Sequence, residues 1–251
     1  MSSTGENAAV AVDDLTKAYG DTVALRDVSL SVSPGEFVSV VGHSGCGKST
    51  LLRVLAGLED DFRGTATVDG VDVRTEGGER VGMVFQEPRL LPWKSVRENV
   101  AVGLPRGVDP DSDDARDRID ALLDRVGLTE FADARPSELS GGMAQRVSLA
   151  RGLAYDPTVM LLDEPFSALD ALTKYEQQDF LLDLWRDSDL TVVLVTHDVE
   201  EAAYLADRVT VLGGQPGTVE TTVDIAEKRP RDRGEWLVDY RDRITTALGV
   251  E

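Results

Sequence analysis

Gly42-His43-Ser44-Gly45-Cys46-Gly47-Lys48-Ser49-Thr50 is the most informative segment of this 251-residue chain. A glycine, four residues and then Gly-Lys-Ser make up the pattern of a phosphate-binding P-loop. The apolar run at 37–41 predicts a buried strand before the loop, and the apolar spacing at 50–56 predicts a helix after it. This strand-loop-helix context favours a P-loop over the alternative, a glycine-rich turn that happens to contain a lysine.

The residue types of the loop suit the binding of a nucleoside triphosphate with Mg²⁺. Glycines let backbone N–H groups turn toward phosphate oxygens, and the helix N-terminus adds its positive dipole end. We expect Lys48 to reach the β- and γ-phosphates and the Ser49 hydroxyl to bind Mg²⁺. Cys46 reads as a tolerated small residue at a variable position. The residues expected to surround the phosphates are Gly42, His43, Ser44, Gly45, Cys46, Gly47, Lys48, Ser49 and Thr50.

The apolar content and the single cysteine are those of an ordinary soluble protein from a reducing compartment. Apolar residues make up 41% of the chain, and no apolar run approaches the roughly 20 residues that span a bilayer. The start of the chain lacks the basic region and apolar core of a secretory signal, and we expect residues 1–8 to be disordered. A single cysteine excludes an internal disulfide and suits a reducing cytoplasm.

The formal net charge of −20 limits the partners of the chain. Such a surface repels nucleic-acid phosphates and anionic lipid, so no nucleic-acid partner is expected. An acidic, lysine-poor composition resembles that of proteins from salt-loving organisms, in which concentrated cations screen self-repulsion. The alternative is a mesophilic protein with solvated acidic faces. Because the acidic excess runs along the whole chain, the sequence favours the halophile.

Strand patterns and helix patterns occupy different parts of the chain. Strands and turns are expected at about 9–41, and Asp69-Gly70 predicts a hairpin turn. The pattern is helical from about 88 to 134, and an amphipathic helix is expected after Pro230. The run at 81–85 predicts another buried strand. Short continuous apolar runs at 159–162, 191–195 and 209–212 are typical of a parallel sheet covered on both faces.

An acidic pair, Asp163-Glu164, ends one of these apolar runs. A carboxylate at the end of a buried strand beside a P-loop can hold Mg²⁺, directly or through water, which is the role expected for Asp163. Glu164 is then placed to polarise an attacking water as a general base. Taken alone, the pair could equally be a strand that ends at a polar turn; the P-loop favours the catalytic interpretation.

A third motif, Leu139-Ser140-Gly141-Gly142, lies between the first two. In this order the three motifs resemble the ATPase subunit of an ABC transporter, over a length from Val10 to about Leu212. The resemblance implies an α/β fold of the P-loop NTPase class, with a RecA-like core and an antiparallel β subdomain. It places the ABC ATPase domain at 9–230, an inserted helical subdomain at about 87–155, and a C-terminal helix at 231–251.

Four further positions match functional residues of that family. Tyr19 matches the aromatic residue that stacks on adenine, although a packed strand tyrosine is the alternative. Gln86 matches the glutamine that senses Mg²⁺ and the attacking water, and Asp170 matches the acid of the loop that crosses to the partner subunit. His197 matches the histidine that contacts the γ-phosphate, although a histidine at a strand end is often a cap or packing residue.

The resemblance also implies a nucleotide-driven dimer. Ser140 and the backbone of Gly141 and Gly142 open a helix, and in the family they cap the γ-phosphate of ATP bound to the other subunit. Two ATP molecules then lie between head-to-tail subunits, which form a homodimer or a heterodimer with a paralogue. The implied catalytic residues are Glu164, His197, Gln86 and Lys48, and the implied metal-binding residues are Ser49, Gln86 and Asp163.

Two details resemble one branch of the family, the importers of nitrate, sulfonates and taurine. Met143 follows the glycines where glutamine is commonest, and the segment 89–93 ends in Leu-Pro-Trp near the expected docking groove for the membrane subunit. Ordinary packing of Trp93 is an equal alternative. This branch implies a separate membrane permease, an extracytoplasmic substrate-binding protein that acts indirectly, and a peripheral location on the cytoplasmic face of the cell membrane. The cargo stays open among small anions and organosulfur compounds.

Two other function classes compete with transport. A soluble ABC-type ATPase could act on DNA or in cluster assembly, but the acidic surface opposes DNA and no long coiled-coil insertion divides the site. A nucleotide sensor without hydrolysis would require damage to the catalytic set, yet Lys48, Asp163, Glu164 and His197 are all present.

The halophile hypothesis predicts that the fold loosens in dilute buffer, because unscreened acidic side chains then repel one another. Thermal unfolding followed by circular dichroism at very low and at high salt checks this. A fully cooperative transition of unchanged midpoint at very low salt would contradict it.

Overall fold

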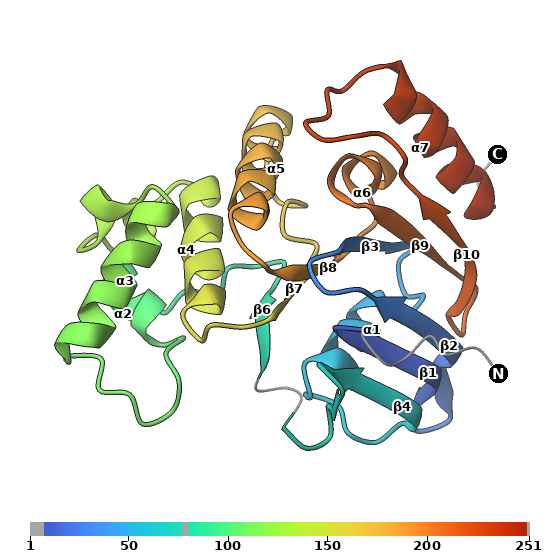
Figure 1. The fold of residues 1–251 in the computed structure, drawn as a ribbon, viewed down its shortest axis with the longest axis horizontal. Helices are drawn as coiled ribbons and strands as arrows, with labels where there is room; N and C mark the ends of the chain where they lie inside the picture. The colour runs from blue at the N-terminus through green and yellow to red at the C-terminus, as the bar shows by residue number, and fades with distance from the viewer. Residues whose placement is uncertain (1–7, 77–79, 250–251) are drawn as a thin grey trace.

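A computed structural model of the chain describes residues 8–76 and 80–249, whose strands form two sheets (Figure 1). The smaller sheet is antiparallel and has the strand order β2-β1-β4-β5. Its strands are β1 (Val10–Tyr19), β2 (Thr22–Val32), β4 (Arg63–Val68) and β5 (Val71–Asp72). Val68 pairs with Val71 across Asp69-Gly70, which confirms the predicted hairpin.

The larger sheet has the order β10-β9-β3-β8-β7-β6, in which only β10 runs antiparallel to its neighbour. Its strands are β3 (Phe37–Gly42), β6 (Val81–Val84), β7 (Val159–Asp163), β8 (Thr191–Thr196), β9 (Arg208–Gly213) and β10 (Thr218–Asp224). The α/β architecture predicted from the P-loop and the apolar runs is confirmed.

Helices cover both faces of the larger sheet (Figure 1). They are α1 (Lys48–Leu55), α2 (Val96–Ala101), α3 (Asp113–Arg125), α4 (Gly141–Leu153), α5 (Ala171–Arg186), α6 (Val199–Leu205) and α7 (Glu235–Ala247). On one face, α1 buries Leu51 and Leu55 in a core shared with the antiparallel sheet. On the other face, a second core contains Phe37 and buried residues of every helix from α2 through α7. None of the described helices is long and apolar enough to cross a membrane.

The strand β10 was not predicted, because its sequence carries little hydrophobic signal. It lies at the edge of the sheet, and of its seven residues only Val223 is buried.

The helix predicted after Pro230 is α7, in which Leu237 and Ile244 are buried. The predicted disorder of residues 1–8 falls almost entirely outside the described residues. Three helices, α2 to α4, lie between β6 and β7, in the region predicted as a helical subdomain.

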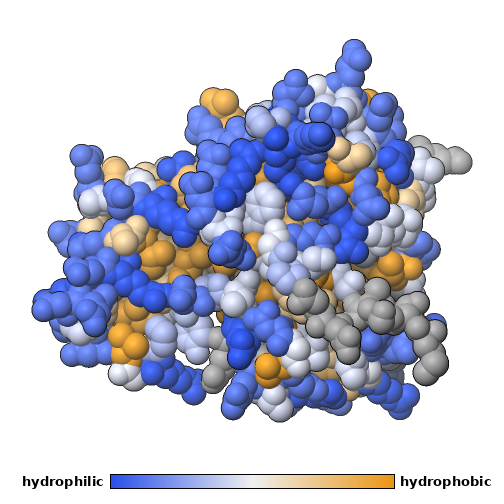
Figure 2. Space-filling model, viewed as in Figure 1, coloured by the Kyte–Doolittle hydropathy of each residue, from blue (hydrophilic) through white to orange (hydrophobic). Residues whose placement is uncertain are grey.

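The register of the larger sheet gathers the predicted motifs at one edge. β3, β7 and β8 are parallel neighbours, with Val41 opposite Thr196 and Asp163 opposite Val195. Because parallel strands finish at a common edge, the P-loop after β3, the acidic pair after β7 and His197 after β8 are brought together. Hydrophilic residues cover most of the face shown in Figure 2, as the composition leads one to expect.

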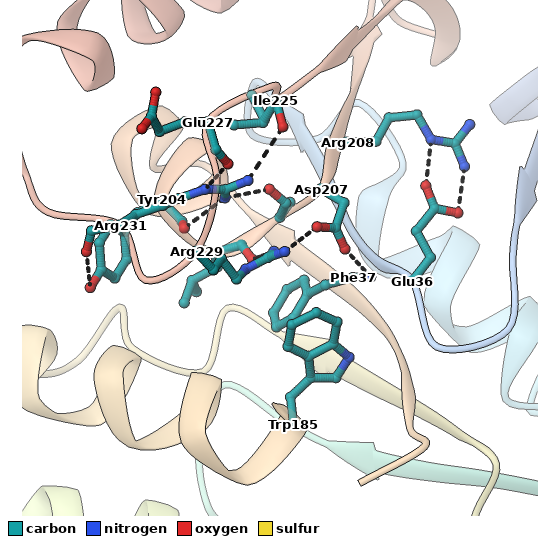
Figure 3. Close-up of polar contacts among 12 residues, drawn as sticks. Glu36, Phe37, Trp185, Tyr204, Asp207, Arg208, Ile225, Glu227, Arg229 and Arg231 are labelled. Atoms are coloured by element: carbon teal, nitrogen blue, oxygen red, sulfur yellow. Dashed lines mark hydrogen bonds and ion pairs between the residues drawn. The ribbon is translucent and has the colours of Figure 1, made fainter. Parts of the chain in front are cut away.

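Arginines of the segment before α7 hold α6 against the core (Figure 3). Arg231 is only 7% exposed, and its Nη1 donates to the carbonyls of Ala203, Tyr204 and Ala206 at the C-terminal end of α6. Burial, followed by the nearby charge of Arg229, lowers the pKa of Arg231 to about 10, so it stays charged at neutral pH. A cation at this end of the helix supplies donors to unpaired carbonyls and opposes the negative end of the dipole.

Arg231→Met should lower the free energy of unfolding by about 3 kcal/mol, because it leaves buried carbonyl groups without a charged donor. The matched control is Arg243→Met, which removes the same charge from an exposed position on α7. Urea denaturation of both variants at one salt concentration measures the difference. Equal midpoints would show that Arg231 contributes nothing to the anchoring of α6.

Candidate functional site

The loop between β3 and α1 is shaped by three glycines. Gly45 and Gly47 have φ values of 81° and 99°, in the left-handed region that favours glycine. A Cβ on Gly47 would lie 2.5 Å from a Leu25 methyl group, and one on Gly42 would lie 2.5 Å from the Leu212 carbonyl oxygen. The sequence therefore needs glycine here both for backbone conformation and for close packing against β2 and β9.

The Lys48 ammonium lies inside this loop rather than in solvent. Lys48 is 6% exposed, and its Nζ donates to the carbonyls of Gly42 at 2.7 Å and His43 at 3.0 Å. It is the first residue of α1, so the positive end of the helix dipole lies at the same place. A charged donor held by the loop's own backbone is suited to bind a phosphate group.

The Cys46 side chain belongs to the hydrophobic core and not to the open side of the loop. It is buried in the cluster that includes Leu51 and Leu212. Burial raises the pKa of the thiol, against the opposing effect of the Lys48 charge. The thiol is therefore a packing group, and a contact between Cys46 and phosphate would have to use its backbone.

Ser49 and Asp163 lie in direct contact. The Ser49 hydroxyl donates to Asp163 Oδ1 at 3.0 Å, from the first turn of α1 to the end of β7. Burial, and then the charge of Glu164, raises the pKa of Asp163, while the Ser49 hydrogen bond and Lys48 act in the opposite direction. The carboxylate is thus held in a place where its charge is costly unless a cation is near.

This pair of oxygens fits Mg²⁺. A hydroxyl and a carboxylate are hard oxygen ligands of the kind that Mg²⁺ prefers, and Mg²⁺ usually completes its shell with water and substrate phosphates. Over residues 8–76 and 80–249, no group of three or more His, Cys, Asp or Glu side chains is arranged to hold a metal ion. The Ser49 hydroxyl and the Asp163 carboxylate could supply two ligands to an Mg²⁺ ion whose other ligands come from water and phosphate.

Glu164 and His197 form the second contact of the site. His197 Nδ1 lies 2.9 Å from Glu164 Oε2, within hydrogen-bonding distance. Glu164 has a φ of 46°, a strained backbone conformation for a non-glycine residue. Its N–H donates to the Val195 carbonyl at 2.8 Å, which ties the acid to β8. Strain of this kind is typical of side chains held in place for function.

Gln86 reaches the same acid indirectly. Its Nε2 donates to the Ser167 hydroxyl at 3.1 Å, and that hydroxyl donates to the Glu164 carbonyl at 3.0 Å. Gln86 follows β6 and therefore lies at the same edge of the sheet as the acidic pair. Nothing in the sequence pointed to Ser167 as the link.

Tyr19 is exposed and is not a packed strand residue. It lies at the end of β1 with 45% of its surface exposed, and its hydroxyl donates to Glu59 Oε1 at 3.0 Å. The Lys17 ammonium lies 4.8 Å from the centre of its ring. A ring held in a fixed position by its hydroxyl, with a free face, can stack on a base.

The serine-glycine motif lies away from the P-loop within one chain. Ser140 begins α4, and its hydroxyl accepts the Met143 N–H at 3.2 Å as a helix cap. Figure 1 shows α4 well separated from α1. The motif packs beside α5 instead: a Cβ on Gly142 would lie 3.2 Å from Thr173 and Gln177. Asp170 caps α5 by accepting the Thr173 N–H, and this contact lowers the pKa of Asp170. One subunit alone does not bring Ser140 to its own Lys48.

Two contacts at the P-loop were not visible in the sequence. A Cβ on Gly217 would lie 1.9 Å from the Cys46 carbonyl oxygen, so the turn before β10 packs directly against the backbone of the P-loop. His43 Nε2 lies 3.1 Å from the Leu248 carbonyl, which brings the end of α7 to the loop. Both partners are far from the loop in sequence. Only the conspicuous Gly213-Gly214 pair hinted at a tight turn nearby.

Comparison with known proteins gives the same family for most of the chain. A family profile described as "ABC transporter" matches residues 25–167. The chain is 53% identical over 218 residues to the aliphatic sulfonates import ATP-binding protein SsuB 1 of Xanthomonas axonopodis pv. citri, a match that covers 86% of each protein. It is 50% identical over 235 residues to the aliphatic sulfonates import ATP-binding protein SsuB 2 of Burkholderia cenocepacia, covering 92% of this chain and 84% of that relative.

Solved structures show the same fold. The dimeric post-hydrolysis state of the ATP-binding cassette MJ0796, bound to ADP and Pi, superposes with a TM-score of 0.75 at 34% identity, covering 87% of this chain and all of that one. The cbiO1 protein of Clostridium perfringens, part of the ABC transporter complex cbiONQ, superposes with a TM-score of 0.79 at 29% identity, covering 88% of this chain and 90% of that one.

Proposed function

The chain belongs to the ABC transporter family and hydrolyses ATP, and we propose that it powers an importer of aliphatic sulfonates or closely related small anions. The observation that carries the hydrolytic part is the edge of the sheet where Lys48, the Ser49–Asp163 contact and the Glu164–His197 contact meet. The cargo class is supported by relatives that are 53% and 50% identical to this chain and are named as aliphatic sulfonate import proteins.

Each residue of the site has a proposed role in this reaction. Lys48 and the loop backbone bind the phosphates, and Ser49 and Asp163, the latter directly or through water, would hold Mg²⁺. Bound Mg²⁺ supplies positive charge to the phosphates during cleavage. Glu164 accepts a proton from the attacking water, and His197 orients Glu164 and contacts the γ-phosphate. Gln86 contacts the metal and the water, and Tyr19 stacks on the adenine.

The separation of Ser140 from Lys48 supports a site completed by a second subunit. We propose that Ser140, Gly141 and the Asp170 loop act on the nucleotide bound to the partner, which is this chain or a paralogue. The exposed leucine beside that loop, Leu172, is 69% exposed and is available for such a contact. A related cassette at 34% identity forms a dimer. ATP then joins the two subunits, and its hydrolysis separates them.

A permease is the proposed membrane partner, with a substrate-binding protein outside the membrane acting through it. Trp93 is 69% exposed, which disfavours the alternative that it is an ordinary packing residue, and it lies within the region proposed as a helical subdomain at about 87–155. A large exposed aromatic residue at this place is suited to a protein contact. The chain would therefore work as a peripheral protein on the cytoplasmic face of the cell membrane.

Glu164→Gln should bind ATP normally and hydrolyse it at least about 10²-fold more slowly, because loss of a catalytic base typically costs this much. Phosphate release under saturating Mg·ATP measures kcat, and a fluorescent ATP analogue measures binding. A matched control is Glu227→Gln, a change of the same kind outside the site. Turnover at the wild-type rate in Glu164→Gln would remove Glu164 from its proposed role.

Pull-down of the tagged chain from detergent-solubilised membranes tests the transport function. High salt during purification suits the acidic surface. Mass spectrometry should find a permease with several membrane spans and a substrate-binding protein, and the ligand retained by that protein would identify the cargo. Recovery of soluble partners alone, with ATPase activity intact, would favour the alternative, an ABC-type ATPase that does not serve transport.

A further inference from the structure

An ion-pair cluster joins the first turns of α5 and α6. Lys174 Nζ lies 2.6 Å from Asp198 Oδ2 and 2.9 Å from Glu201 Oε2. Gln178 also donates to Glu201 Oε2, at 3.2 Å. These contacts cross between two helices that are otherwise separate elements of the chain, so they fix the spacing of the two helix starts.

The Glu201 end of the cluster is shielded from water, whereas the side chains of Lys174 and Asp198 are 17% and 37% exposed. Glu201 is 3% exposed, and burial raises its pKa even though Lys174 opposes the shift. Burial is the largest single influence on Asp198, but the hydrogen bond and charge of Lys174, together with backbone hydrogen bonds from Glu201 and Glu200, outweigh it and lower the pKa of Asp198. The Lys174 pKa is raised because the two carboxylates outweigh the opposing effect of burial. Arg233 is the other cation nearby, 3.3 Å from Asp179 and 3.1 Å from the Gln178 amide oxygen.

Each end of the cluster is next to a part of the catalytic site. Asp198 directly follows His197 and caps α6, since its Oδ1 accepts the Glu201 N–H at 3.0 Å. Its own N–H donates to the Thr196 hydroxyl at 3.0 Å, so both flanks of His197 are held. On the other side, the Lys174 N–H donates to the Asp170 carbonyl at 2.8 Å, which places Lys174 one turn after the Asp170 loop.

We propose that Lys174 is a positioning residue for ATP hydrolysis: by binding Asp198 and Glu201 together, it holds His197 against Glu164 and ties that pair to the Asp170 loop. This inference rests on the roles proposed above for Glu164 and His197. Lys174 itself touches no reacting group. Its effect passes through Asp198 to the neighbouring His197, whose Nδ1 lies 2.9 Å from the Glu164 carboxylate.

If Lys174 only stabilised the fold, its replacement would lower stability without a selective loss of turnover. Removing Lys174 alone would leave the buried Glu201 charge uncompensated and could unfold the protein. The informative variant is therefore the double change Lys174→Met with Glu201→Gln, which removes both charges and retains an acceptor for Gln178. It leaves Asp198 without its cation, and hence His197 without this support.

The experiment measures kcat, KM and ATP affinity of the purified full-length chain with Mg·ATP, together with the thermal midpoint. We expect the double variant to lower kcat at least tenfold, with KM and ATP affinity changed less than about twofold, since small displacements of catalytic groups cost up to about 10²-fold. Lys174→Arg should recover most of kcat, because a guanidinium can pair with both carboxylates. Arg186→Met, a charge loss at the far end of α5, should leave kcat unchanged.

Wild-type kcat in a folded double variant would overturn the inference, and so would a parallel loss of kcat and ATP affinity that Lys174→Arg does not reverse. Glu164→Gln and His197→Ala are measured alongside. If these two variants lose turnover while the double variant keeps it, only the role of Lys174 is wrong. If they keep turnover, the proposed function of the site is wrong as well.

Discussion

The parallel register of β3, β7 and β8 sets the positions of the residues that make up the site. The sheet is buried on both faces, so each strand can pair only in the register that hides its apolar residues. That register ends the strands at a common edge, with Asp163 opposite Val195 and Val41 opposite Thr196. Ser49 and Asp163 are far apart in the sequence, and the register of the strands before them brings the two side chains into contact.

Charge at this edge is balanced over a short distance in a chain of net charge −20. The Lys48 ammonium and the N-terminus of α1 attract phosphate, whereas Asp163 and Glu164 repel it. Burial raises the pKa of Asp163, which shows that its negative charge is costly there without a cation. A divalent ion bound with the phosphates would offset this repulsion, and the Ser49 hydroxyl is already beside the carboxylate.

The helix α6 has seven residues, too few for a helix to be stable in water on its own. It is held from both ends by cations from other parts of the chain. Arg231 donates to three carbonyls at its C-terminal end (Figure 3), and Lys174 binds the cap residue Asp198 at its N-terminal end. His197 precedes this cap, so its position depends on segments that lie before and after it in the sequence.

The fold class, the P-loop and the acidic pair could be predicted from the sequence, because glycine spacing, continuous apolar runs and carboxylates at strand ends are local patterns. It did not reveal β10, whose edge position leaves it mostly polar, or the packing of Gly217 under the loop. It also could not show that the Cys46 thiol faces the core, or that Lys174 links two helices. These features arise when the chain folds, because each depends on contacts between residues distant in sequence, and local propensity does not predict such contacts.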